Sequence, residues 1–298
     1  MVDLTNACGE RIPTIGLGTY PLQGRALADL IKAAVKIGYR LFDTADDYRG
    51  ETGIGLALKE LKNENVCHRE DLFIQTKISG DAAYNDEPYA GIVFSNYSSF
   101  MKRHSVEEIV REKVEKSLRE MATDYLDSLL IHLPYSGFYY EIWEAMIKIK
   151  KEGKVRSIGV SNFHKKHIDV ISRTGVLPAI NEIYISPIGI KEDQISYNIL
   201  NGIQLMTYSP LMDLTHNRLS LEVMKPIMEK YGKSAAQIVL RWNIDRNCIP
   251  LPKTSNPKRL QENFNIFDFS LTPEEIILIS SMNKDYQYLP ESTICPGI

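Results

Sequence analysis

The chain has 298 residues, of which 44% are hydrophobic and 24% charged, so it can build a large core and is not a disordered polypeptide. Its 35 basic and 38 acidic residues give a formal net charge of −3, which argues against a nucleic-acid or acidic-membrane partner. No apolar run approaches the roughly 20 residues of a membrane span, and Met1 to Gly18 lacks the apolar segment of a signal peptide. We therefore expect a cytoplasmic protein.

The cysteines are far apart in the sequence and form no CxxC pair, at Cys8, Cys67, Cys248 and Cys295. Such spacing favours neither a zinc site nor a disulfide framework. Reduced thiols and no bound metal are expected.

Short apolar segments alternate with longer amphipathic segments along nearly the whole chain. The short segments predict about eight strands, at residues 15–18, 41–43, 72–77, 128–132, 157–161, 179–182, 204–208 and 248–251. The longer segments predict helices, among them residues 27–35, 106–121, 139–152 and 234–242. Apolar strands separated by helices are typical of a parallel sheet that is covered on both faces.

Eight parallel strands can close into a barrel, so we predict a (β/α)8 TIM barrel in which residues 1–298 form one domain. The alternative is an open doubly wound sheet, which would carry a GxGxxG turn after a strand. Gly16-Leu17-Gly18 is followed by Thr19-Tyr20-Pro21, so that motif is absent.

Residues 78–105 interrupt the alternation, with many turn-forming residues and several aromatic ones. Structureless loops of this length are uncommon in compact domains and are often functional. Because the segment leaves the end of a strand, we predict an inserted loop on the catalytic face, part of it a wall or lid over the substrate.

Polar residues follow the predicted strands, where a barrel places its catalytic groups. They are Asp43, Lys77, His132, Ser161, Asn162, Glu182 and Tyr208, with Tyr48 shortly after the first. A nearby ammonium lowers the pKa of a tyrosine, and a carboxylate keeps that ammonium charged. A histidine can orient a carbonyl oxygen, which gives a proton-delivery site. No side chain of this set delivers hydride, so a cofactor must supply it.

Five motifs in one order along the chain resemble the aldo-keto reductase superfamily: Phe42–Tyr48, Ile131–Pro134, Gly159–Phe163, Tyr208–Leu211 and Pro252–Ser255. The resemblance runs from about residue 12 to residue 271. It implies a metal-free barrel enzyme that moves hydride between NADPH and a carbonyl group. It also implies roles for the catalytic set, in which Tyr48 is the general acid, Lys77 lowers its pKa, Asp43 pairs with Lys77 and His132 orients the carbonyl.

The same resemblance implies how the cofactor is held. Ser161, Asn162 and Glu182 would hold the nicotinamide carboxamide, and Tyr208 would stack on its ring. The other implied cofactor contacts are Thr19, Tyr20, Asp43, Ser209, Leu211, Lys253, Thr254, Ser255, Arg259, Glu262 and Asn263. Lys253 and Arg259 place two cations near the ribose, which favours the 2′-phosphate of NADPH/NADP+ over NADH.

The sequence departs from the family pattern at three places. Arg49-Gly50-Glu51 stands where the family usually has Gly-Asn-Glu, and Leu133 stands where a tryptophan often follows the histidine. Glu182 replaces the usual glutamine, and an ionised carboxylate cannot donate to the carboxamide oxygen. Either nicotinamide binding is weaker or Glu182 is protonated.

The main prediction is an NADPH-dependent reductase of an aldehyde or ketone, and the alternative is a nicotinamide-dinucleotide-binding sensor with little turnover. The expected partner is a small carbonyl or alcohol, with no nucleic acid or membrane, and the chain is expected to be a monomer or a weak homo-oligomer. Histidines outside the motifs are expected to be solvated, at His104, His164, His167 and His216.

Overall fold

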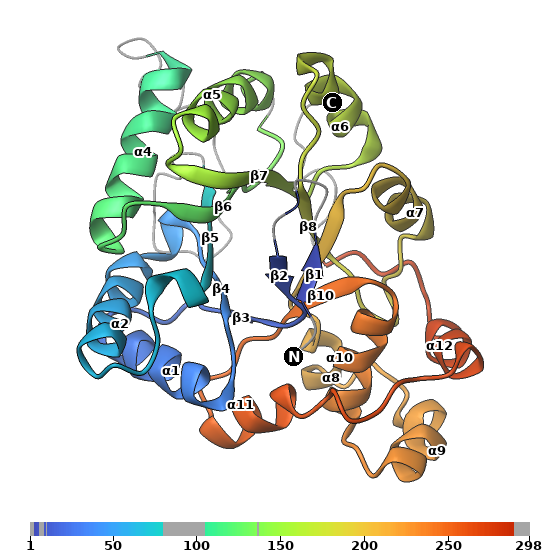
Figure 1. Cartoon of the computed structure of the whole chain (residues 1–298). Helices are drawn as coiled ribbons and strands as arrows, with labels where there is room; N and C mark the ends of the chain where they lie inside the picture. The colour runs from blue at the N-terminus through green and yellow to red at the C-terminus, as the bar shows by residue number, and fades with distance from the viewer. Residues whose placement is uncertain (1–2, 6–8, 10, 80–104, 136, 289–298) are drawn as a thin grey trace.

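The computed structural model describes residues 3–5, 9, 11–79, 105–135 and 137–288. Figure 1 looks along the axis of a barrel, with the strands forming an inner ring and the helices lying around it. One domain holds the whole arrangement, so the predicted (β/α)8 barrel is confirmed and the open doubly wound sheet is wrong. The predicted lid lies almost wholly outside the described residues, because only its ends, at 78–79 and 105, are included.

The barrel has eight parallel strands, each paired with its neighbour in sequence. They are β3 (Gly16–Gly18), β4 (Leu41–Asp43), β5 (Phe73–Ile78), β6 (Leu126–Ile131), β7 (Val155–Ser161), β8 (Ile180–Tyr184), β9 (Gln204–Tyr208) and β10 (Cys248–Leu251). All eight predicted strands are confirmed to within two residues at either end. The first and last strands also meet, since the Gly18 amide donates to the Pro252 carbonyl at 3.1 Å.

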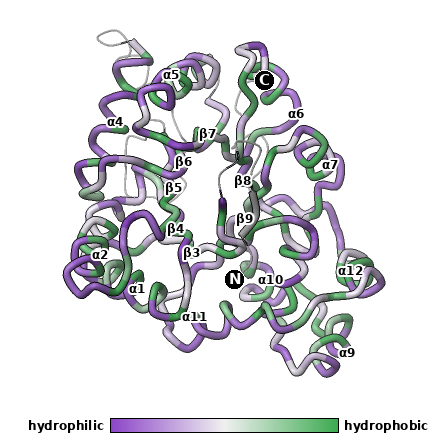
Figure 2. Tube along the Cα trace, in the orientation of Figure 1, coloured by the Kyte–Doolittle hydropathy of each residue, from purple (hydrophilic) through white to green (hydrophobic). Residues whose placement is uncertain are grey.

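Helices follow most strands and cover the outside of the barrel. They are α1 (Gly24–Ile37), α2 (Glu51–Asn63), α4 (Val106–Glu120), α5 (Tyr139–Lys151), α6 (Lys165–Ile171), α7 (Glu192–Leu200), α8 (Met212–Thr215), α9 (Leu221–Tyr231), α10 (Ala235–Asp245), α11 (Pro257–Phe264) and α12 (Pro273–Ser280). Short 3-10 turns are η1 (Asp46–Tyr48), η2 (Arg69–Asp71) and η3 (Ser172–Thr174). Figure 2 shows hydrophobic and hydrophilic residues interleaved along these helices, as one-sided burial requires.

Local sequence explains where two of the predicted helices begin. The Ser105 hydroxyl accepts from the Glu108 amide at 3.2 Å, and the Ser234 hydroxyl accepts from the Gln237 amide at 3.4 Å. These are N-caps, which satisfy amide groups that have no partner inside the helix.

Buried clusters lie on both sides of the strand ring, one inside it and two outside it. Inward-facing residues fill the barrel, with Leu41, Phe73, Leu130, Ile180, Met206, Ile249 and Leu251 in one cluster. Outward-facing residues such as Phe42, Ile74 and Leu129 join the larger cluster beneath the helices. Alternation along each strand therefore separates the inward-facing residues from those that pack under the helices.

A two-stranded antiparallel sheet of β1 (Asp3–Thr5) and β2 (Arg11–Pro13) precedes the barrel, and it was not predicted. It lies at the amino ends of the barrel strands, because only two residues separate β2 from β3. Ile12 is fully buried among the inward-facing residues of the barrel. This end is thus closed by side chains, and the opposite end carries the polar groups.

Two further findings concern the described part of the chain. It contains no helix that is both long enough and apolar enough to cross a membrane. Cys67 and Cys248 are buried free thiols, as expected, whereas Cys8 and Cys295 lie outside the described residues.

The prediction of solvated histidines is wrong for His167, which is fully buried. Its Nδ1 atom accepts from the His164 amide at 3.0 Å at the start of α6, which supplies its polar partner. His164 itself is half-buried, His216 is exposed, and His104 lies outside the described residues.

The contact between α2 and α4 gives a stability prediction. A Cβ atom on Gly55 would lie 2.3 Å from the Glu120 carbonyl oxygen, so an alanine there must push the helices apart. Alanine has the better helix propensity by about 1 kcal/mol, yet we expect Gly55→Ala to lose about 1–3 kcal/mol of unfolding free energy in urea. Thr52→Ala, on the exposed face of α2, is the control and should not lose stability. A Gly55→Ala protein as stable as the parent would contradict this packing.

Candidate active site

Four of the predicted site residues meet at the carboxyl end of the barrel. Asp43 ends β4, Lys77 lies near the end of β5, His132 follows β6, and Tyr48 ends η1. The structure therefore brings together side chains that are up to 89 positions apart in the sequence, from Asp43 to His132.

Lys77 and Asp43 form a buried ion pair. Lys77 Nζ donates to Asp43 Oδ1 at 2.6 Å and to Oδ2 at 2.7 Å, and also to the Thr44 carbonyl at 3.1 Å. The lysine is 0% exposed and the aspartate 4%. Burial acts to lower the pKa of Lys77, but the Asp43 and Glu182 carboxylates raise it well above its ordinary value. The ammonium is therefore charged throughout the physiological pH range.

Tyr48 is held by a short turn that is anchored on both sides. Asp46, in the same turn, accepts from the Ser79 amide at 3.0 Å and from Lys113 Nζ at 2.9 Å. The Tyr48 hydroxyl lies 3.4 Å from His132 Nε2, and Lys77 Nζ lies 5.4 Å from the centroid of its ring. The turn thus presents the phenol between an imidazole and an ammonium.

Burial raises the pKa of the Tyr48 phenol above its ordinary value, whereas the Lys77 ammonium lowers it and the nearby carboxylates raise it. Lys77 thus acts in the predicted direction, but burial outweighs it in the protein without cofactor. The phenol remains protonated at neutral pH, as a proton donor must be.

His132 has a partner for its second ring nitrogen. Ser79 Oγ lies 2.8 Å from Nδ1, and the Asp47 carboxylate is 3.7 Å from the same atom. Burial lowers the pKa of His132, although the charge of Asp47 opposes the shift. A neutral imidazole is the form that can donate one hydrogen bond while Nδ1 accepts another.

Glu182 projects from β8 into the same cluster. Its Oε1 atom lies 3.3 Å from Lys77 Nζ, and its Oε2 atom accepts from Gln75 Nε2 at 2.9 Å. Gln75 Nε2 also donates to Asp43 Oδ1 at 2.9 Å, so one amide group joins the two carboxyl groups. Burial raises the pKa of Glu182 to about 8, with Asp43 adding to the rise and Lys77 opposing it.

Ser161, Asn162 and Tyr208 form a connected polar group beside this cluster. Asn162 Nδ2 donates to Ser161 Oγ at 3.0 Å and to the His132 carbonyl at 3.2 Å, and its Oδ1 accepts from the Tyr208 hydroxyl at 2.9 Å. Ser161 Oγ donates to the Glu182 carbonyl at 2.9 Å. Hydroxyl and amide groups held in this way suit a carboxamide ligand, which needs both donors and acceptors.

A pocket opens next to Tyr208, and the end of the described chain forms one of its walls. Asn162, Tyr184, Tyr208 and Tyr288 are among its lining residues. The Tyr288 ring lies 5.6 Å from the Tyr184 ring and 6.3 Å from the Tyr208 ring, between centroids. An aromatic wall of this kind suits a flat ring as ligand.

The remaining predicted cofactor residues lie in three places around the rim of the barrel, which is the ring formed by the carboxyl ends of its strands. Thr19 Oγ1 donates to the Asp43 carbonyl at 2.9 Å, and the Tyr20 ring, 46% exposed, lies 5.0 Å from the Tyr48 ring. Ser209 and Leu211 lie between β9 and α8, with Ser209 at a φ of 50°. The others gather around the start of α11, in the order Lys253, Thr254, Ser255, Arg259, Glu262 and Asn263.

Within that third group, some residues are exposed and others are buried in hydrogen bonds of the fold. Lys253, Ser255 and Arg259 are exposed, whereas Thr254 and Asn263 are buried. Thr254 Oγ1 accepts from the Asn256 amide at 3.0 Å, and Glu262 accepts from the Ser234 hydroxyl. Lys253 and Arg259, two exposed cations at the start of an eight-residue helix, suit an anionic group.

Sequence analysis missed Gln75 and Ser79, which hold the site together. Both lie two residues from Lys77, and successive residues of a strand alternate between its faces. Polar residues at positions 75, 77 and 79 therefore share one face, and this period-2 pattern could have identified them.

No group of three or more histidine, cysteine or acidic side chains among the described residues could hold a metal ion. The residues gathered at the rim instead match the needs of a dinucleotide: a carboxamide site, an aromatic wall and an anion site. These three features lie in chain order along β7, β9 and the start of α11.

Comparisons with known proteins agree with the fold. The model of the Aldo/keto reductase family matches residues 14–284. Methylglyoxal reductase DkgA of Escherichia coli (strain K12) is 34% identical over 286 residues, which cover 95% of this chain and 94% of the relative. Glyoxal reductase of Bacillus subtilis is 35% identical over 284 residues, which cover 95% of this chain and 93% of the relative.

A solved structure gives the same result. The aldo-keto reductase of Bombyx mori in complex with NADP has a TM-score of 0.83 and 29% identity, over 98% of this chain and 95% of that one. The fold and the comparisons together define a single-domain (β/α)8 barrel oxidoreductase. The chain belongs to the aldo/keto reductase family.

The buried ion pair gives the second prediction. Lys77→Met leaves two buried carboxyl groups without their ammonium, and we expect a loss of about 3–5 kcal/mol in urea unfolding. Adding Asp43→Asn removes one of those charges, so the double variant should be more stable than Lys77→Met alone. Lys165→Met breaks an exposed pair with Asp169 and should cost less than about 1 kcal/mol. If Lys165→Met and Lys77→Met lost equal unfolding free energy, burial would not determine how much the Lys77 ion pair contributes to stability.

Proposed function

We propose that this protein is an NADPH-dependent reductase that converts an aldehyde or ketone to an alcohol, with Tyr48 as the general acid. The observation that carries the proposal is the cluster at the rim, in which the Tyr48 hydroxyl lies 3.4 Å from His132 Nε2 and its ring lies beside the Lys77 ammonium. A sensor that only binds dinucleotide has no need of such a proton donor.

Each side chain of the cluster has a definite task in this reaction. The protonated Tyr48 hydroxyl donates its proton to the carbonyl oxygen as negative charge develops there. With Ser79 donating to Nδ1, His132 keeps its proton on Nε2 and can donate a hydrogen bond to the same oxygen. Lys77, fixed by Asp43, stabilises the phenolate that the proton transfer leaves on Tyr48. When bound, NADPH supplies the hydride.

The binding residues follow from the polar groups around the rim. Ser161 and Asn162 would hold the nicotinamide carboxamide, and Tyr208 would pack against the ring. The backbone at Ser209 and Leu211 would contact the pyrophosphate. Lys253 and Arg259, both exposed at the start of α11, would bind the ribose 2′-phosphate, which NADH lacks.

Small aldehydes, including α-dicarbonyl compounds, are the first substrates to test. Relatives that match nearly the whole chain carry the names methylglyoxal reductase and glyoxal reductase. Leu133, half-buried next to His132, leaves the site without a large aromatic at that position.

The role of Tyr48 is tested by Tyr48→Phe, which removes only the hydroxyl group. We expect kcat for aldehyde reduction to fall by about 10²–10⁴-fold, because general acid catalysis contributes about that much. Binding of NADPH, measured by quenching of protein fluorescence, should remain within a few-fold of the parent.

Tyr197→Phe is the matched control, because the Tyr197 hydroxyl donates to Asp169 at 2.7 Å on the surface of the protein. Its turnover should equal that of the parent. Near-normal turnover in Tyr48→Phe would remove Tyr48 as the proton donor.

The preference for NADPH is tested at α11. Charge-assisted hydrogen bonds to phosphate contribute about 1.5–3 kcal/mol, so Lys253→Ala and Arg259→Ala should each raise the Kd for NADPH about tenfold or more. The Kd for NADH should hardly change, since it has no 2′-phosphate.

Lys258→Ala, at an exposed position of the same helix, controls for the loss of a positive charge in this region. It should weaken NADPH binding far less than either of the other two variants. Parallel losses for NADPH and NADH would mean that these cations do not read the 2′-phosphate.

A further inference from the structure

The cluster beneath Tyr48 contains more acid than base. Asp43 and Glu182 are 4% and 1% exposed, and the single ammonium between them, Lys77, is 0% exposed. If both carboxyl groups were ionised, one negative charge would remain buried without a counter-charge. Such a charge is very costly in a protein interior, and neighbouring groups shift their protonation to avoid it.

The distances indicate which carboxyl group carries the ammonium's counter-charge. Lys77 Nζ donates to both oxygens of Asp43, at 2.6 and 2.7 Å, whereas the nearest oxygen of Glu182 is 3.3 Å away. The Gln75 amide bonds equally to the two groups, at 2.9 Å each. Asp43 is therefore the carboxylate that hydrogen bonds and the ammonium stabilise better, and a proton shared by the two groups is more stable on Glu182.

Other ionisable groups also face Glu182. Asp43 faces it from β4, Lys77 from β5, and the phenols of Tyr48 and Tyr208 act on it from η1 and β9. Only Lys77 among these favours the ionised form, while Asp43 and any phenolate oppose it. Two carboxyl groups that share one site cannot both ionise easily.

We propose that Glu182 holds a dissociable proton at neutral pH and, through Lys77, acts as a positioning residue that controls how strongly the ammonium favours the Tyr48 phenolate. With Glu182 protonated, the charge of Lys77 is balanced by Asp43 alone. When Glu182 loses its proton, a second negative charge offsets the field of Lys77 at the phenol, and the Tyr48 proton is held more tightly.

The kinetic consequence rests on the proposed function, with Tyr48 as the acid. Proton donation to the carbonyl should become slower as Glu182 ionises, near pH 8. One unit of pKa change on the donor corresponds to a factor of ten in equilibrium, so a decrease of roughly three- to tenfold in kcat is expected across this step.

The first test is a pH profile of kcat for aldehyde reduction with saturating NADPH. The parent should show the decrease near pH 8, and the profile of Glu182→Gln, which cannot ionise, should lack that step at whatever absolute kcat the variant has. Glu51→Gln is the matched control. Glu51 is also buried, bonds to Thr76 Oγ1 at 2.7 Å, and burial raises its pKa to about 7, yet it does not contact Lys77 in the described structure.

The control should keep the parent's decrease near pH 8, because Glu182 is intact in it. An identical profile in the parent and Glu182→Gln would overturn the proposal.

The second test does not depend on turnover. The infrared carbonyl band of protonated carboxyl groups is measured against pH in the protein without cofactor. In Glu51→Gln the band that titrates near pH 8 should remain, and in Glu182→Gln it should be lost. If Glu182→Gln does not fold, the absence of a carbonyl band in Glu51→Gln at neutral pH still contradicts the proposal.

The two measurements separate this inference from the proposed function. A titrating Glu182 band in a protein that reduces no carbonyl would leave the bound proton established and reject the reductase. Turnover without such a band would support the reductase and reject the role of Glu182.

Discussion

A buried ammonium is the constraint around which the rest of this site is arranged. Lys77 has no contact with solvent, so the fold must supply a counter-charge and hydrogen-bond acceptors for it. β4 and β5 do so because their parallel register pairs Asp43 with Gln75. Lys77 lies two residues after Gln75 on the same face of β5, so its side chain reaches the Asp43 carboxylate. The ion pair thus bridges two adjacent barrel strands, and the position of the Tyr48 turn follows from the same pairing. The arrangement of the buried charges therefore depends on the pairing of two neighbouring barrel strands.

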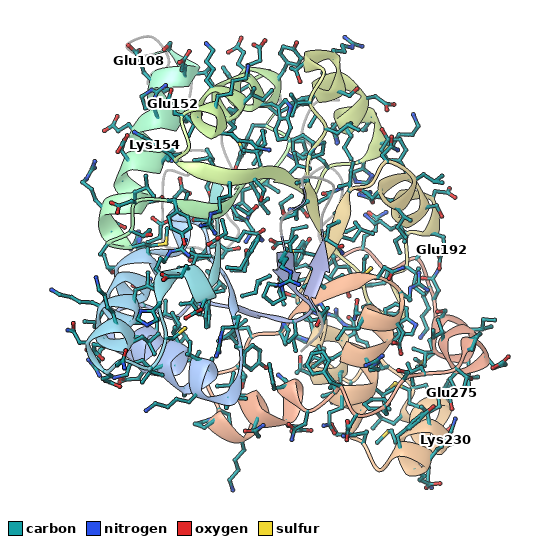
Figure 3. All side chains as sticks on the ribbon, viewed as in Figure 1. Glu108, Glu152, Lys154, Glu192, Lys230 and Glu275 are labelled. Carbon is teal, nitrogen blue, oxygen red and sulfur yellow. The ribbon has the colours of Figure 1, made fainter. Side chains whose placement is uncertain are left out.

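Charges on the outside of the barrel have a different role. Figure 3 labels Lys230 and Glu275, which lie together near α9 and α12 and form an ion pair at 2.6 Å. Water and mobile ions screen such pairs, and each contributes at most about 1 kcal/mol. The buried pair of Lys77 and Asp43 has no such screening, so its charges must be balanced by the side chains that surround it. Buried charges such as those of Lys77, Asp43 and Glu182 therefore act more strongly on the acidity of Tyr48 than surface charges do.

The sequence allowed the barrel and its rim to be predicted, because apolar strands followed by polar residues are a local pattern. Gln75 was missed although it lies on the Lys77 face, since a single amide inside a strand has no motif. The β1–β2 sheet was missed because its two strands precede the strand–helix alternation that revealed the equally short β3 and β4. His167 was placed wrongly at the surface because its partner is the backbone of α6. The direction of the Glu182 side chain depends on contacts across the barrel between β8 and β5, which no local pattern contains.

Glu182 shows how one exchange of an amide for a carboxyl group changes the chemistry of a packed site. The two groups have nearly the same size, so the packing of the barrel tolerates either. The carboxyl group, however, must either carry a proton or add a negative charge beside Lys77, whose ammonium already forms an ion pair with Asp43. Burial and the neighbouring Asp43 carboxylate favour the first state, while the two N–H bonds of Gln75 join Glu182 to Asp43 and hold the pair at a fixed separation. A residue that does not touch the phenol can then set its acidity, since in a dry interior a charge acts over several ångströms with little screening.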